Sequence, residues 1–142
     1  MLANIGVIAG IVLLAVEIRQ NTVAVELAAA NNSINSVQLN TNLLVADGEL
    51  AAIIEKALLG NKLAGAEAIR ANAYFANTLR GWQVLYYQQK DAVLRQELWN
   101  TARVEMQMIV GADYGLYEFW IDNRGRYSDE FNGFLMSLRD SR

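Results

Sequence analysis

Histidine and cysteine are both absent from this chain of 142 residues. Without histidine the protein has no Ser-His-Asp triad, no Glu-x-x-His di-iron motif and no imidazole that could act as a general base near neutral pH. Without cysteine it has no disulfide, no thiol nucleophile and no thiolate ligand for a metal. The commonest catalytic and metal-binding arrangements are therefore excluded, and we expect a protein that is not an enzyme and holds no cofactor.

Proline is also absent, and charged residues are few. The lack of Pro suits a chain made of helices and short turns, because Pro interrupts the hydrogen bonding of a helix interior. Charged residues make up 19% of the chain, below the usual share of about 25%, and the net charge is −3. The chain has no cluster of Lys or Arg and so lacks the basic surface that nucleic acids require. We expect no nucleic-acid partner.

An almost unbroken apolar run, LANIGVIAGIVLLAVEI, occupies residues 2–18. As a helix it reaches roughly 25 Å, slightly less than the hydrocarbon core of a membrane at about 30 Å. Three interpretations compete: a retained membrane anchor, a buried helix of a soluble bundle or oligomer, and a cleaved signal peptide. No basic residue precedes the run, which disfavours a signal peptide. We therefore predict an anchor segment over residues 1–20, with Glu17, Arg19 and Gln20 at its boundary with water.

The helical pattern continues without a break to about Ala46. Apolar or small residues alternate at spacings of four and three, as in a heptad repeat that lines one face of a helix. These residues are Val23, Leu27, Ala30, Ile34, Val37, Thr41 and Leu44. The stripe either packs inside the protein's own bundle or binds a partner subunit. For the second interpretation, the candidate interface residues are Val23, Leu27, Ile34 and Val37.

The rest of the chain, residues 21–142, is predicted to form a single helical domain. Asp47 and Ser128 have side chains suited to N-caps, and Gly60 and Gly111 end two of the helices. No segment alternates apolar and polar residues with period two, so we expect an all-α bundle without a sheet. After the long first helix, the predicted helices span residues 49–59, 64–89, 94–110, 114–122 and 129–138. The residues expected to be buried in the helix over 64–89 are Ile69, Ala73, Ala76, Leu79 and Tyr86.

Aromatic residues gather in two places. Trp82, Tyr86 and Tyr87 share one predicted helix, and Trp99 on the next can reach them, an arrangement more typical of a core than of a ligand site. The second group is denser, with four aromatics in seven residues that cannot all face one core. Some of these side chains are expected at a partner interface, where Tyr and Trp are common anchors. The candidates are Tyr114, Tyr117, Phe119 and Trp120.

Arg124 and Arg126 flank Gly125 in a predicted loop. Two guanidinium groups so close in sequence can bind a phosphate or carboxylate. The alternative is that they pair with acidic side chains of the same region, as exposed arginines often do. The acidic residues within reach are Asp122, Asp129 and Glu130.

A resemblance to a known group of proteins comes from residues 7–22, VIAGIVLLAVEIRQNT. The sequence is similar to a widespread group of uncharacterised bacterial proteins that begin with a hydrophobic helix ending in an I-R-Q-N-T-like signature and continue as an all-helical domain. Further echoes follow in the group's order: YYQ at 86–88, ELW at 97–99, FW at 119–120 and YSDEF at 127–131. The resemblance implies a bacterial protein with a membrane-anchored helical domain, and it implies no activity.

Together these patterns predict a long N-terminal anchor helix that continues into a compact helical bundle. The expected function is that of a non-enzymatic accessory or scaffolding subunit, bound to membrane lipid and to other subunits of a membrane complex or a homo-oligomer. The alternative is a membrane-anchored helical domain that binds a ligand or acts as a sensor. Arg19 is the only basic residue close to the run, so the positive-inside rule favours a single pass through the bacterial inner membrane with the domain in the cytoplasm.

Overall fold

The computed structural model describes residues 2–113 and 115–141; within the first helix, the side chains of residues 2–9, 26, 27, 29–34, 36 and 37 lie outside the description. The described chain forms six α-helices and one short 3-10 helix, without strands, which confirms the all-α prediction. The elements are α1 (Leu2–Ala46), α2 (Gly48–Leu58), α3 (Gly65–Lys90), α4 (Gln96–Val110), α5 (Leu116–Asp122), η1 (Arg124–Arg126) and α6 (Asp129–Asp140).

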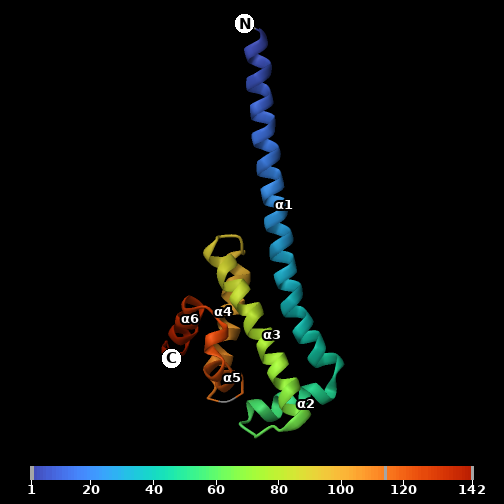
Figure 1. Cartoon of the computed structure of the whole chain (residues 1–142), viewed down its shortest axis with the longest axis vertical. Helices are drawn as coiled ribbons and strands as arrows, with labels where there is room; N and C mark the ends of the chain where they lie inside the picture. Colours follow the sequence, from blue (N-terminus) through green and yellow to red (C-terminus); the bar gives the residue numbers. More distant parts are fainter. Residues whose placement is uncertain (1, 114, 142) are drawn as a thin grey trace.

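Helix α1 is the longest element, with 45 residues. At 1.5 Å per residue it measures roughly 68 Å. Its C-terminal part runs beside α3, whereas its N-terminal part projects beyond the rest of the chain (Figure 1). The prediction of one continuous helix from the apolar run to Ala46 is confirmed.

The turn between α1 and α2 is fixed by Asp47. Its carboxylate accepts a hydrogen bond from the backbone N–H of Leu50 at 2.9 Å, which caps α2 as predicted. Arg70 of α3 forms ion pairs with Asp47 at 2.6 Å and with Glu49 at 2.8 Å. At the other end of α2, Gly60 adopts a left-handed φ of 75°, the conformation in which glycine ends many helices. The polar contacts of Arg70 therefore tie the α1–α2 turn to α3.

Helix α3 is the centre of the bundle and contacts α1, α2, α4 and α5. Leu79 is fully buried on it, as predicted, but Ile69 is 71% exposed and Ala73 is also exposed. The prediction for these two residues was wrong because apolar side chains occupy both faces in the first half of α3. Their spacing alone does not decide which face is buried. Packing of neighbouring helices selects the other face. Its buried residues are Ala71, Phe75, Ala76, Leu79, Trp82 and Leu85.

The C-terminal end of α3 meets α4 and α6 in an aromatic cluster. The ring of Tyr86 stacks on Phe134 at 4.8 Å between centroids and lies 6.4 Å from Trp99. Trp99 is 8% exposed, so the predicted packing of this residue in the core is confirmed. Ser128 caps α6 by accepting from the backbone N–H of Phe131 at 3.3 Å. The cluster closes the bundle where three helices converge.

Helix α5 begins against α2. Gly115 precedes it with a left-handed φ of 67°, and a Cβ at this position would lie 3.1 Å from the carbonyl oxygen of Ala57. Only glycine combines this backbone conformation with so close an approach. The contact sets the position of α5, which packs against both α3 and α4.

Replacement of Leu79 by Ala tests the central role of α3. We expect Leu79→Ala to lower the free energy of unfolding by about 3 kcal/mol, because it opens a cavity at a fully buried site. Ile69→Ala on the same helix is the matched control and should change it by less than about 0.5 kcal/mol, since Ile69 is exposed. Urea unfolding followed by circular dichroism gives both values. Equal losses in the two variants would contradict the assignment of the buried face.

The cap at Asp47 predicts a pH dependence. The N–H of Leu50 and the positive charge of Arg70 hold the pKa of Asp47 below its ordinary value. The charged carboxylate therefore stabilises the fold above about pH 4, and this contribution disappears as the pH falls through the lowered pKa. Asp47→Asn keeps a good cap without the charge. We expect the variant to melt below the wild type at about pH 6 and the gap to close at about pH 2; a constant gap would refute the role of the charge.

Candidate functional site

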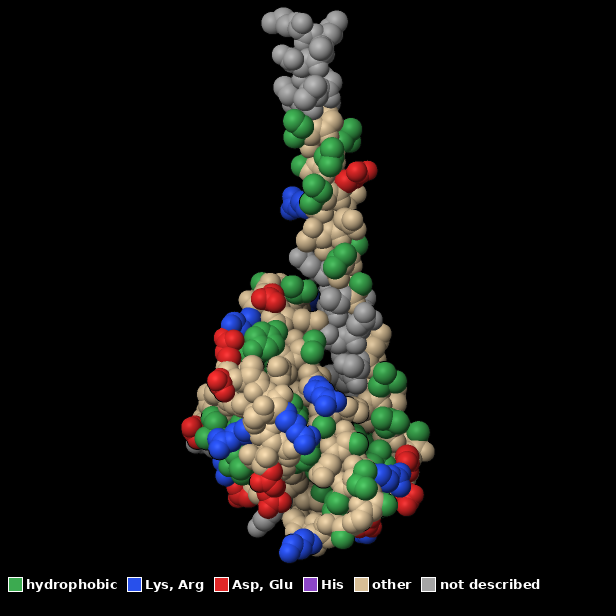
Figure 2. Space-filling view, in the orientation of Figure 1, with side chains coloured by type: hydrophobic (Ala, Val, Ile, Leu, Met, Phe, Trp, Pro, Cys, Tyr) green, Lys and Arg blue, Asp and Glu red, His purple; other side chains and the backbone are tan. Residues whose placement is uncertain are grey.

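The projecting part of α1 carries apolar side chains on every side. Successive residues of a helix are 100° apart, so the four consecutive residues from 11 to 14 point in all directions. A helix that is apolar all round is normally buried in a protein or in lipid. Figure 2 shows hydrophobic side chains on this projecting part of α1, which we call the stalk. Their exposed fractions lie between 47% and 66% for Ile11, Val12, Leu13, Leu14, Val16 and Ile18.

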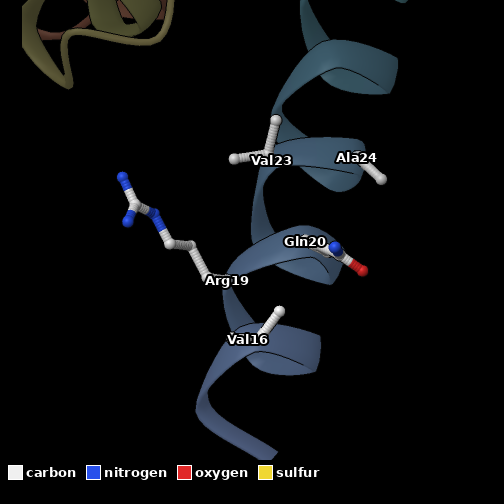
Figure 3. A pocket seen from close by; sticks show the side chains of 5 residues that line it. All are labelled: Val16, Arg19, Gln20, Val23 and Ala24. Carbon is white, nitrogen blue, oxygen red and sulfur yellow. The ribbon is translucent and has the colours of Figure 1, made fainter. Parts of the chain in front are cut away.

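The predicted boundary residues lie at the C-terminal end of the exposed run, with Glu17 just before Ile18 and Arg19 and Gln20 just after it. Glu17, Arg19 and Gln20 are all exposed, and their side chains form no ion pair or hydrogen bond within the described structure. Figure 3 shows Arg19 and Gln20 on opposite sides of the helix, next to a shallow hollow. The hollow is bounded by residues of α1 alone, from Val16 to Ala24, and a single helix cannot enclose a ligand. We call the three polar residues Glu17, Arg19 and Gln20 the polar collar of α1.

The described residues include no helix that is both long enough and apolar enough to cross a membrane. The anchor predicted over residues 1–20 lies partly outside the description, because residue 1 and the side chains of residues 2–9 are not part of it.

The predicted interface stripe of α1 divides into different environments. Val23 is 47% exposed, and the side chains of Leu27, Ile34 and Val37 lie outside the described residues. At the C-terminal end of the stripe, Leu44 is half-buried and packs against the core. This end of the stripe packs inside the bundle.

The C-terminal aromatic candidates are mostly occupied by packing within the chain. Phe119 is 8% exposed and Trp120 is fully buried, because α5 is covered by α3 and α4. Tyr117 is half-buried, and the guanidinium of Arg139 lies over its ring at 3.7 Å from the centroid. Tyr114 lies outside the described residues. The structure gives Phe119 and Trp120 a place in the core.

A groove between α3 and α5 is the main concave feature of the bundle. It consists of two adjoining hollows that share Asn72, Phe119 and Asn123. The larger hollow, about 900 Å³, lies between the α2–α3 loop, α3 and α5. The smaller, about 310 Å³, lies between α3, α5 and η1. The sequence contained one signal for this groove, because Asn72, Asn77 and Arg80 recur at spacings that place them on one face of α3.

The smaller hollow is positively charged. Arg80 of α3 and Arg126 of η1 line it, together with three asparagines and no acidic residue. Neither arginine forms an ion pair in the described part of the chain, so the pairing considered for Arg126 with neighbouring acids is not found there. One of those acids, Glu130, instead binds Lys90. Sequence reasoning identified Arg126 but missed Arg80, because the two lie far apart in the chain.

Tyr127 links the two arginines electrostatically. Its side chain is 8% exposed, and burial raises the pKa of its phenol above the ordinary value. The positive charges of Arg80 and Arg126 act in the opposite direction and lower the same pKa. Both guanidinium groups therefore lie within electrostatic reach of one phenol.

The backbone around η1 is held by the side chain of Asn132. Its Nδ2 donates to the carbonyl oxygens of Arg124 at 3.1 Å and Tyr127 at 3.3 Å, and its Oδ1 accepts from Nε1 of Trp120 at 2.9 Å. One amide thus fixes both ends of the turn that carries Arg126. The turn is therefore held in place by hydrogen bonds within the chain.

The two surfaces described above differ in the groups that they offer. Among the described residues, no cluster of acidic side chains is arranged to hold a metal ion. The groove supplies cations and amides, and the stalk of α1 supplies apolar surface. In comparisons with protein families, curated proteins and solved structures, nothing matches the chain.

Removal of the Asn132 side chain tests the support of η1. Asn132→Ala leaves the Nε1–H of the buried Trp120 without a partner, and we expect a loss of about 2 kcal/mol in the free energy of unfolding. Asn100→Ala on α4 is the control, because Asn100 is exposed and bonds only to a side chain on the same helix. Thermal and urea unfolding measure both. A loss no larger than that of the control would refute the role of Asn132.

Proposed function

We propose that this protein is a non-enzymatic accessory or scaffolding subunit of a membrane-bound protein complex, attached through the N-terminal half of α1. The observation that carries the proposal is the run of apolar side chains exposed on all sides of the projecting helix. Full burial of one such side chain is worth about 1.5 to 3 kcal/mol. Six of them between residues 11 and 18 give a strong tendency to leave water for lipid or for an apolar partner.

The polar collar supports this mode of attachment. Glu17, Arg19 and Gln20 lie at the end of the apolar run, and their side chains form no ion pair or hydrogen bond in the described structure, as expected of groups at a lipid headgroup layer. The long side chain of Arg19 can extend its charge toward water while its methylene groups stay on apolar surface. Beyond the collar, the same helix continues into the bundle. The attachment helix and the bundle therefore share one rigid element.

We propose the bacterial inner membrane as the location, with the bundle on the cytoplasmic side. The support is the single charge of Arg19 on the bundle side of the run, together with the resemblance of residues 7–22 to bacterial membrane-anchored proteins.

The surface for partner subunits is the side of α1 that the bundle leaves open. Leu39 and Leu43 lie one helical turn apart and are 61% and 49% exposed. Nearer the collar, Val25 is 64% exposed and lies about 40° from Leu39 around the helix axis. These side chains extend the apolar surface of the stalk toward the bundle. A partner helix that packs along α1 would bury them.

The alternative function, a ligand-binding or sensory domain, required a closed apolar pocket between the helices that carry Trp82 and Trp99. That space holds buried side chains, since Leu79, Trp82 and Met106 are each at most 3% exposed. The geometry therefore favours the accessory subunit over a sensor built on an apolar pocket in the core.

Flotation with lipid vesicles tests the attachment. Ile11 and Leu39 are 62% and 61% exposed on the same helix, but only Ile11 lies in the apolar run. Placing Arg within a membrane-embedded helix costs about 3 kcal/mol. We expect Ile11→Arg to reduce co-flotation with vesicles roughly a hundredfold and Leu39→Arg to leave it unchanged.

Mild detergent extraction of the wild-type protein from its native membrane, followed by mass spectrometry, provides the second readout. We expect an assembly larger than one chain, and Leu39→Arg should release the partner. A protein that does not float with vesicles, or that extracts at monomer mass without a partner chain, would refute the proposal.

A further inference from the structure

We propose that the groove between α3 and α5 binds a soluble small molecule through an oxyanion group, a phosphate or carboxylate, held by Arg80 and Arg126. The two guanidinium groups come from different elements, α3 and η1, and line the same hollow of about 310 Å³. This binding site is separate from the membrane attachment and does not depend on it.

The charges in the hollow are unbalanced. Two like charges held in one hollow repel each other, and the residues that line it include no carboxylate to offset them. Both arginines are also without ion pairs elsewhere in the described chain. A bound phosphate, with a charge of about −2, would offset both positive charges, and a carboxylate would offset one of them. The planar fork of a guanidinium matches the paired oxygens of phosphate and carboxylate.

Neutral amides complete the site. Asn72 and Asn77 are exposed side chains of α3 in the same hollow, and each supplies donors for the remaining oxygens of an anion. The Nδ2 of Asn123 is already used, because it donates to the carbonyl oxygen of Phe119 at 2.8 Å. Its oxygen can therefore accept from a hydroxyl or amine of the ligand. The hollow therefore offers both hydrogen-bond donors and an acceptor to a polar ligand.

The site is also partly preorganised. Arg80 lies within a long helix that is packed on several neighbours, and the turn of Arg126 is held at both ends by Asn132. A ligand therefore needs to order only the two arginine side chains. Rigid supports of this kind reduce the entropic cost of binding.

The adjoining hollow indicates the shape of the ligand. It contains apolar surface from Phe75 and Ile121 and meets the cationic hollow at Phe119. The charged residues that line it are Lys62, Glu118 and Asp122. An elongated molecule can place its anionic end at the arginines and a less polar body along the rings. The groove is part of the bundle, which lies away from the tip of α1 (Figure 1). This position favours a soluble ligand over a lipid headgroup.

Titration of the full-length protein in neutral detergent with inorganic phosphate tests the site. Nitrogen-15 NMR at constant ionic strength should show saturable shifts of the Arg80 and Arg126 side-chain signals. We expect Arg80→Gln and Arg126→Gln each to weaken phosphate binding about tenfold or more, and the double variant to abolish it. Arg103→Gln on α4, also exposed, is the matched control and should bind like the wild type.

Melting curves serve as the control for folding. We expect the variants to remain folded, because both arginines are exposed. Shifts that do not saturate, or a weakening that is equal in the Arg103 control, would overturn the proposal. Flotation with anionic and neutral vesicles distinguishes the source of the anion. A preference for anionic vesicles that the double variant loses would assign the arginines to a lipid headgroup and overturn the soluble ligand. If the wild-type protein does not float with vesicles, the proposed membrane attachment is refuted, whereas the phosphate titration still tests the anion site.

Discussion

Burial of one face of α3 is the constraint on which the rest of the bundle depends. Leu79 and Trp82 lie on that face with almost no exposure, and α1, α2, α4, α5 and α6 all contact α3. Because the side chains of a packed core interlock, a change in the facing of α3 would displace all of its neighbours. The groove exists because α5 packs on α3 at one edge of this face and leaves the adjacent polar face open.

The long helix α1 combines two environments that are seldom found in one element. Its C-terminal part packs on α3, where Leu44 joins the core and Asn40 donates to Thr78 at 3.4 Å. Its N-terminal part exposes apolar side chains on every side. Because α1 is one unbroken helix, the exposed apolar residues and the part that packs on α3 belong to the same element.

The two candidate surfaces differ in chemistry and lie apart. The stalk offers apolar contact area with a polar collar, and the groove offers two unpaired cations and amides. In the groove, the positions of the charges are set by contacts outside it: α3 packing for Arg80 and the Asn132 hydrogen bonds for Arg126. The two surfaces are joined through the packing of the C-terminal part of α1 on α3.

Local signals in the sequence were enough to determine the helices. The caps at Asp47 and Ser128, the end of a helix at Gly60 and the unbroken α1 each depend on residues within a few positions of one another. Which face of each helix is buried was decided only by tertiary structure. Ile69 fits a helical stripe as well as its buried neighbours do, yet it is exposed because α3 packs through its other face. The same packing buried Phe119 and Trp120 and brought Arg80 beside Arg126, because contacts between distant segments depend on how whole helices fit together and leave no local pattern in the chain.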